Sequence, residues 1–219
     1  VVRADSVVPV PAGWSDGEGA TLPCAGVTAW RALVVQGGIR AGDTVLVLGT
    51  GGVSLFALQI ARLHGARVCV TSSSDQKLAR ALALGAEVGL PYREVPEWGR
   101  RAAEWAGGGV DVVVEVGGAG TLDQSLRAVR PGGRIALLGV LAGARTELAL
   151  TRVFMQGVRL EGVFVGSRAD HEAVTRAFSA AAQVRPVIDQ VYEFSEVPAA
   201  FERLASGAHF GKVVVRVGR

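Results

Sequence analysis

The chain has 219 residues, of which 49% are hydrophobic, and a formal net charge of +3. This length and apolar content suffice for one sizeable hydrophobic core with a small appendage, and they exclude an extensively disordered chain. No apolar stretch is long enough for a membrane helix and the start does not resemble a signal peptide, so no membrane partner is expected. The basic residues are scattered without a stripe or tail, which argues against a nucleic-acid partner. Two cysteines without a spacing pattern indicate the reducing cytoplasm.

Short apolar runs alternate with segments of helical spacing along most of the chain. Strands are expected at 44–48, 67–71, 110–116, 134–138 and 158–165. Helices are expected at 55–63, 75–84 with Asp75 as N-cap, 96–106, from Thr121 onward, and 169–182. This alternation indicates βαβ units. The predicted fold class is therefore α/β, a doubly wound parallel sheet of the Rossmann type.

The two ends of the chain fall outside this alternation. Residues 1–23 are rich in proline, glycine and acid and are expected to be extended. At the other end, residues 187–192, a helix at 197–204 and a strand at 212–217 form an appendage. Both ends are expected to pack on something other than the alternating core.

A glycine-rich turn, Gly49-Thr50-Gly51-Gly52-Val53-Ser54, joins the first expected strand to its helix. Gly49 permits a tight turn and Gly51 lets the backbone approach a pyrophosphate, while the helix N-terminus offers free N–H groups. Ser54 stands where a third glycine is usual, so a slightly wider approach of helix and strand is expected. The pattern predicts a dinucleotide site, and a methyltransferase with a similar turn is the rival interpretation.

The end of the second strand bears on which dinucleotide binds. The segment Thr71-Ser72-Ser73-Ser74 contains no carboxylate to hold a free ribose 2′-hydroxyl, and Lys77 follows one helical turn later. Hydroxyl groups together with a cation favour a 2′-phosphate. The sequence therefore favours NADP(H) as cofactor, with NAD(H) as the alternative. The competing interpretation is that the serines cap the helix and Lys77 is solvated.

Several motifs, in order, resemble the medium-chain dehydrogenases/reductases, in their alcohol-dehydrogenase-like and quinone-oxidoreductase-like branch. They are the glycine turn, the Thr71 to Lys77 segment, Leu22-Pro23-Cys24-Ala25-Gly26-Val27-Thr28-Ala29, Glu115-Val116-Gly117-Gly118 and His209-Phe210-Gly211-Lys212-Val213-Val214. The resemblance implies a Rossmann domain at 31–186. It also implies remnants of a GroES-like catalytic domain at both ends, namely its last part at 1–30 and a return segment toward it at 187–219. The remainder of that domain would lie outside this chain.

The same resemblance assigns cofactor contacts. Ser73, Lys77 and Tyr92 would hold the 2′-phosphate, with Ser72 and Arg93 beside them. The other implied contacts line the ribose, nicotinamide and pyrophosphate, and they are Thr28, Val116, Gly117, Leu138, Gly139, Val140, Phe164, Val165, Gly166 and Lys212. The alternative interpretations are that the glycines at the strand ends form plain turns and that Phe164 is a core residue.

Cys24 matches one zinc ligand of zinc alcohol dehydrogenases. A catalytic zinc needs two more protein ligands, and none of the three histidines has ligand spacing to Cys24. No metal is therefore expected in this chain, and Cys24 is expected to be a free, half-buried thiol.

Together these features predict an NADPH-dependent oxidoreductase that transfers hydride to a quinone, enone or carbonyl/alcohol substrate. The chain would contain mainly the cofactor-binding domain, and no catalytic residue is assigned. The alternative is a nucleotide-binding module without turnover of its own. Besides a small-molecule substrate, the expected partner is a second copy, in a homodimer formed through the exposed sheet edge at 158–165.

Overall fold

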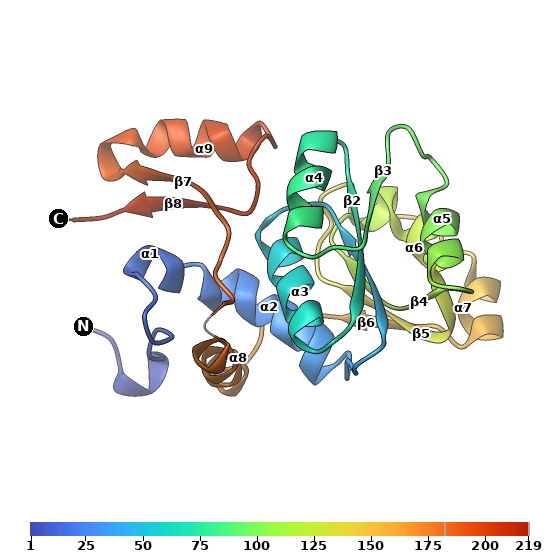
Figure 1. Ribbon diagram of the computed structural model, residues 1–219, viewed down its shortest axis with the longest axis horizontal. Helices are drawn as coiled ribbons and strands as arrows, with labels where there is room; N and C mark the ends of the chain where they lie inside the picture. The colour runs from blue at the N-terminus through green and yellow to red at the C-terminus, as the bar shows by residue number, and fades with distance from the viewer. Residues whose placement is uncertain (182, 219) are drawn as a thin grey trace.

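The computed structural model describes residues 1–181 and 183–218 (Figure 1). Its largest unit is a six-stranded sheet with the strand order β3-β2-β1-β4-β5-β6, and every neighbouring pair is parallel. The strands are β1 (Thr44–Leu48), β2 (Arg67–Ser72), β3 (Val88–Pro91), β4 (Val110–Glu115), β5 (Val129–Leu137) and β6 (Arg159–Gly162). The order reverses between β1 and β4, which is where open α/β sheets bind ligands beyond the carboxyl ends of their strands. The predicted α/β fold is confirmed.

Both faces of the sheet are buried, and β1 shows why its sequence is apolar throughout. Successive side chains of a strand point to opposite faces. Val45 and Val47 belong to one core cluster, with Phe56 and Phe178, whereas Leu46 belongs to a second cluster on the other face. The helices that enclose these cores are α3 (Gly52–Leu63), α4 (Asp75–Ala83), α5 (Trp98–Trp105), α6 (Leu122–Ala128), α7 (Leu150–Gln156) and α8 (Arg168–Ala180).

Several element boundaries differ from the sequence prediction. The N-cap of α4 is Ser74, whose hydroxyl accepts a hydrogen bond from the Lys77 amide, and not Asp75. The strand expected at 158–165 ends at Gly162, before a loop in which Val165 has a φ of +48°. Neither β3 nor α7 is expected from the sequence, since β3 has only four residues and contains both glycine and proline. The predicted end of the 169–182 helix lies outside the described residues.

The two ends of the chain pack on each other beside the main sheet (Figure 1). The prediction that residues 1–23 are extended is wrong in part, because Ser15 and Glu18 form a capping box that starts α1 (Asp16–Gly19). Consecutive helical turns then run through 22–35 and include α2 (Val27–Trp30). The C-terminal part forms a separate two-stranded parallel sheet of β7 (Ile188–Glu193) and β8 (Lys212–Arg216), which packs against α9 (Val197–Ala205).

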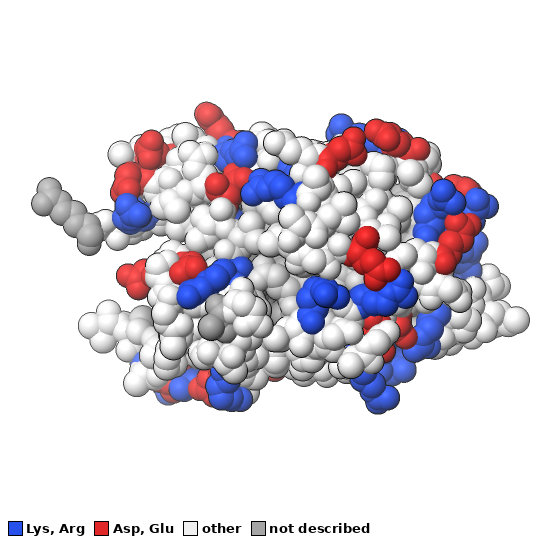
Figure 2. Space-filling view, in the orientation of Figure 1, with Lys and Arg blue, Asp and Glu red and all other residues white. Residues whose placement is uncertain are grey.

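The surface shown in Figure 2 carries basic and acidic side chains mixed with one another rather than one continuous basic tract. Many of them form surface ion pairs, such as Arg67 with Glu87 at 2.6 Å. Within residues 1–181 and 183–218, no helix combines the length and the apolar character needed to cross a membrane.

Candidate functional site

The glycine turn lies at the carboxyl end of β1 and leads directly into α3. Gly49 has a φ of +72°, a conformation that favours glycine, and a side chain added at Gly49 or Gly51 would meet no atom within 4 Å. No side chain caps the N-terminus of α3. The turn therefore presents an open backbone surface and the positive end of a helix dipole, as a bound phosphate requires.

Ser54 replaces the third glycine and makes a specific contact. Its side chain is buried, and its hydroxyl donates a 2.7 Å hydrogen bond to the carbonyl oxygen of Leu48, the last residue of β1. This bond fixes the first turn of α3 to the end of the strand, so the geometry of the turn is held without a third glycine.

The C-terminal strand brings Lys212 to the same turn. The Gly211 amide donates a 2.9 Å hydrogen bond to the Thr50 carbonyl oxygen, and Gly51 and Gly211 pair as an isolated parallel bridge. The aliphatic part of Lys212 lies so close to Gly52 that a Cβ atom there would overlap it. The structure thus joins two of the sequence-predicted segments, 49–53 and Lys212, that are about 160 residues apart.

The predicted 2′-phosphate residues gather at the ends of β2 and β3. The Tyr92 amide donates a 3.1 Å hydrogen bond to the Ser72 carbonyl oxygen, which places Tyr92 and Arg93 next to Ser73. Ser73, Tyr92 and Arg93 are exposed. Ser72, in contrast, is buried, and its hydroxyl accepts a hydrogen bond from the Ser74 amide at 3.3 Å.

The competing interpretation is borne out in part, because Ser74 caps α4, but the partly exposed Lys77 side chain has a partner within the protein. Its ammonium group donates a hydrogen bond to the Gly207 carbonyl oxygen, which ties α4 to the segment before β8. Partial burial, followed by the nearby Arg203 guanidinium, lowers the pKa of Lys77 below its ordinary value. An ammonium group has three donors. One is used in this contact, so Lys77 retains the capacity to bind an anion.

Glu115 organises the loop that follows β4, although no role is expected for it from the sequence. Its carboxylate is fully buried and accepts hydrogen bonds from the amides of Gly117, at 2.7 Å, and Gly118, at 3.1 Å. The hydroxyl groups of Thr121, at 2.6 Å, and Ser125 also donate to it. A carboxylate at the end of an apolar strand, followed by two glycines, is the sequence signal that indicates such a role.

The loop after β4 also contacts the loop after β5, and so brings together the predicted residues Val116, Gly117, Leu138 and Gly139. The Ala142 amide donates a 2.7 Å hydrogen bond to the Gly117 carbonyl oxygen. A Cβ atom at Gly139 would come within 2.5 Å of the Val116 carbonyl oxygen, so this contact requires glycine. Val140, at the outer end of this loop pair, is exposed.

The predicted loop 164–166 lies beyond the end of β6. Phe164 is 93% exposed, so the alternative that it is a core residue is wrong. Val165 adopts a left-handed conformation, which is strained for a β-branched residue and is found mainly at functional sites. Gly166 packs so closely between Val27 and Asp170 that a side chain there would overlap both.

Asp170, in the first turn of α8, fixes the residue that follows this loop. Asp170 accepts hydrogen bonds from the Ser167 amide, at 2.8 Å, and from Arg31, at 2.7 Å. Burial opposes ionisation of Asp170, but these hydrogen bonds outweigh it and lower the pKa of the carboxyl group. Thr28 is buried, and its hydroxyl donates a 2.6 Å hydrogen bond to the Cys24 carbonyl oxygen, so only its acceptor capacity remains for a ligand.

Cys24 is exposed, which corrects the prediction of a half-buried thiol. It lies in the first helical turn after Thr21. Among the described residues, no group of three histidine, cysteine, aspartate or glutamate side chains is placed to hold a metal ion. The residues present therefore do not form a zinc site by themselves.

The two thiols are expected to react very differently with a thiol reagent at pH 8. Cys69 is buried in β2, and burial raises the pKa of its thiol to about 12, so it is both inaccessible and protonated. Ellman's reagent should therefore label one thiol rapidly in the native protein, and a second only after denaturation. Mass spectrometry should place the first label on Cys24. Rapid labelling of both thiols in the native protein would contradict the burial of Cys69.

The doubly wound sheet, the open glycine turn and the loops clustered at the carboxyl ends of β1, β4 and β5 define a Rossmann-type nucleotide-binding protein. The family model described as zinc-binding dehydrogenase matches residues 52–183, and the chain belongs to this family. The predicted resemblance to medium-chain dehydrogenases/reductases is thereby confirmed.

Individual relatives agree with this assignment. The chain is 41% identical to a zinc-type alcohol dehydrogenase-like protein of Schizosaccharomyces pombe, over 99% of this chain and 64% of the relative. A solved structure of an NAD-dependent alcohol dehydrogenase superposes with a TM-score of 0.89 at 36% identity, covering 96% of this chain and 62% of that one.

A 2-octenoyl-CoA carboxylase reductase solved with NADP and 2-octenoyl-CoA superposes with a TM-score of 0.90 at 28% identity, covering 98% of this chain and 52% of that one. The chain thus spans between one half and two thirds of the length of these relatives.

Proposed function

We propose that the chain is the cofactor-binding part of an NAD(P)-dependent oxidoreductase. The observation that carries this proposal is the glycine turn, whose open backbone at Gly49 and Gly51 adjoins the uncapped N-terminus of α3. These residues fit a pyrophosphate, because backbone N–H groups and the helix dipole both favour an anion there. When bound, a reduced nicotinamide supplies the hydride, and the protein residues hold and orient the cofactor.

We infer that NADPH is preferred over NADH. No carboxylate stands at the end of β2, and the exposed Ser73, Tyr92 and Arg93 lie close together, with Lys77 at the start of α4. This collection of hydroxyl and cationic groups suits a phosphate, whereas a free 2′-hydroxyl is usually held by a carboxylate. Relatives with either cofactor are known, since one similar structure is an NAD-dependent enzyme and another contains NADP. The preference therefore depends on the residues of this chain.

Substitution of Ser73 by aspartate tests the preference. The new carboxylate should repel a 2′-phosphate and raise the Kd of NADPH at least about tenfold, while the Kd of NADH stays the same or falls. Fluorescence titration of the purified protein with each cofactor measures both constants. The matched control is Ser179→Asp, which adds the same charge on α8, a helix away from β2. Tighter binding of NADH than of NADPH by the unsubstituted protein would refute the preference.

We propose a quinone, an enone or a carbonyl/alcohol pair as the substrate class. The exposed Phe164 and Val140, beside the loops after β6 and β5, offer an apolar surface next to the expected nicotinamide position. The alternative is a nucleotide-binding module without independent turnover. Reduction of a quinone by the purified 219-residue chain with NADPH would contradict this alternative.

We also propose that two copies associate through β6. This strand is at the edge of the six-stranded sheet, so a symmetry-related copy of β6 could pair with it in an antiparallel manner. Sedimentation at high concentration should show a dimer, and monomer alone would refute the proposal. The two free thiols fit the reducing cytoplasm as its location.

A further inference from the structure

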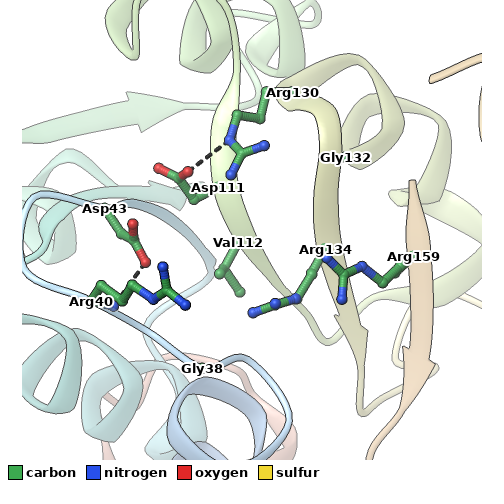
Figure 3. Close-up of a pocket in the computed structure, with 9 residues that line it drawn as sticks. All are labelled: Gly38, Arg40, Asp43, Asp111, Val112, Arg130, Gly132, Arg134 and Arg159. Atoms are coloured by element: carbon green, nitrogen blue, oxygen red, sulfur yellow. Dashed lines mark hydrogen bonds and ion pairs between the residues drawn. The ribbon is translucent and has the colours of Figure 1, made fainter. Parts of the chain in front are cut away.

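A cavity lies at the amino end of the sheet, opposite to the glycine turn, and its lining residues are shown in Figure 3. Its volume is about 280 Å³. It opens beside the amino ends of β1, β4 and β6 and beside the segment of β5 from Arg130 to Arg134. The residues that line it are Gly38, Arg40, Asp43, Asp111, Val112, Arg130, Gly132, Arg134 and Arg159. None of them belongs to the cofactor site described above.

The lining has an excess of positive charge. It contains four arginines and two aspartates, and both carboxylates already have partners. Asp111 accepts hydrogen bonds from the Thr44 amide at 2.7 Å and from Arg130 at 2.7 Å. Asp43 accepts a 2.8 Å hydrogen bond from the Arg40 amide. These bonds turn the carboxylates toward protein donors and leave Arg134 and Arg159 without acidic partners.

Arg134 and Arg159 are adjacent on neighbouring strands. They are register partners in the parallel pairing of β5 with β6, so their side chains leave the same face of the sheet. Figure 3 shows the Arg159 side chain directed toward Arg134, and that of Arg134 directed toward the loop of Gly38. Neither guanidinium forms an ion pair with any residue in 1–181 or 183–218. Two like charges side by side are unfavourable unless an anion neutralises them.

The position of Arg134 indicates that its unpaired state is built into the fold. Its Nε atom is buried and has no hydrogen-bond partner among the described residues. A side chain at Gly38 would approach the Arg134 guanidinium to 3.3 Å, so the glycine leaves room for this group. Buried polar groups normally have partners, so this donor calls for an explanation, and an anion bound beside the guanidinium is one that fits the charge of the cavity.

We propose that this cavity binds the phosphate group of a small molecule, with Arg134 and Arg159 as its principal ligands. Guanidinium groups match the oxygens of a phosphate in pairs, and two of them in one cavity bind it more specifically than a general positive field does. The cavity is smaller than the range typical of drug-sized ligand pockets, so it suits a compact phosphate compound rather than a dinucleotide. The bound phosphate would lie at the amino end of the sheet, remote from the cofactor.

Thermal unfolding with inorganic phosphate as the probe tests the proposal. At a phosphate concentration one hundred times its Kd, the Tm should rise by about 5–10 °C relative to sodium chloride of equal ionic strength. Arg134→Gln and Arg159→Gln should each weaken phosphate binding at least tenfold in calorimetric titration. Arg176→Gln removes an exposed arginine from α8 outside the cavity and should leave the affinity unchanged. Phosphoenolpyruvate, titrated in the same way, distinguishes a phosphate ester from the free ion: tighter binding than that of inorganic phosphate supports an ester, and weaker binding supports the free ion.

The outcomes separate this site from the glycine turn. Gly51→Val obstructs the turn but not the cavity, so phosphate binding should persist in that variant. Equal affinity in Arg134→Gln, Arg159→Gln and the unsubstituted protein would overturn the proposal, as would an equal response to chloride. Should Arg134→Gln fail to fold, Arg159→Gln alone decides, since Arg159 is exposed and its replacement leaves no buried gap.

Discussion

Replacement of Glu115 by alanine is expected to lower the free energy of unfolding by about 3–5 kcal/mol. The carboxylate is fully buried and accepts hydrogen bonds from two amides and two hydroxyl groups. Alanine removes the acceptor for all four donors and leaves them in an interior that water does not reach. Urea denaturation followed by circular dichroism measures the change. A loss of this size would make Glu115 one of the most important polar residues of the fold.

Glutamine at position 115 distinguishes loss of charge from loss of hydrogen bonds. Its amide oxygen can still accept from Gly117 and Gly118, and its NH₂ group can donate to the Ser125 hydroxyl, so the expected loss is only about 1 kcal/mol. Glu94→Ala, on the exposed segment after β3, is the matched control and should change the stability by less than about 0.5 kcal/mol. Equal effects of Glu115→Ala and Glu94→Ala would show that the buried carboxylate does not stabilise the loop.

The elements that sequence reasoning predicts well are those whose signal is local. The run 44–48 is apolar throughout because β1 is covered on both faces, and the glycine turn follows it directly. The capping box of α1 is also local, since Ser15 precedes Glu18 by three residues. It therefore provides a sequence signal that favours a helix against the expectation of an extended N-terminal segment.

The features that escape prediction depend on contacts between distant segments. Lys77 meets Gly207 across 130 residues, and no local pattern distinguishes that contact from a solvated lysine. Arg134 and Arg159 become neighbours only through the register of β5 and β6. The fourfold acceptor role of Glu115 needs the turn at Gly117 and Gly118 to direct their amides back toward the strand end. Such arrangements follow from tertiary structure, which residue types and spacing do not specify.

Substitution of Gly51 is expected to have the largest effect on cofactor binding with little effect on the fold. The backbone of Gly51, with φ −78° and ψ −179°, is extended and accessible to any residue, and an added Cβ would meet no protein atom within 4 Å. The same side chain would occupy the space through which a pyrophosphate approaches the turn. Alanine should therefore weaken NADPH binding moderately, and valine about a hundredfold, which corresponds to about 2.7 kcal/mol.

Cofactor affinity and stability need to be measured on the same preparations, because the affinity is expected to change while the stability does not. Fluorescence titration gives the Kd of NADPH, and thermal unfolding without cofactor should give Tm values within about 2 °C of the unsubstituted protein. Gly17→Ala controls for glycine replacement as such. It adds a Cβ at an ordinary contact distance from Val214, where the two ends of the chain pack on each other. Unchanged NADPH affinity in a folded Gly51→Val protein would mean that the pyrophosphate does not bind at this turn. A graded loss from alanine to valine at constant stability is the result expected if the open space at Gly51 is the phosphate site.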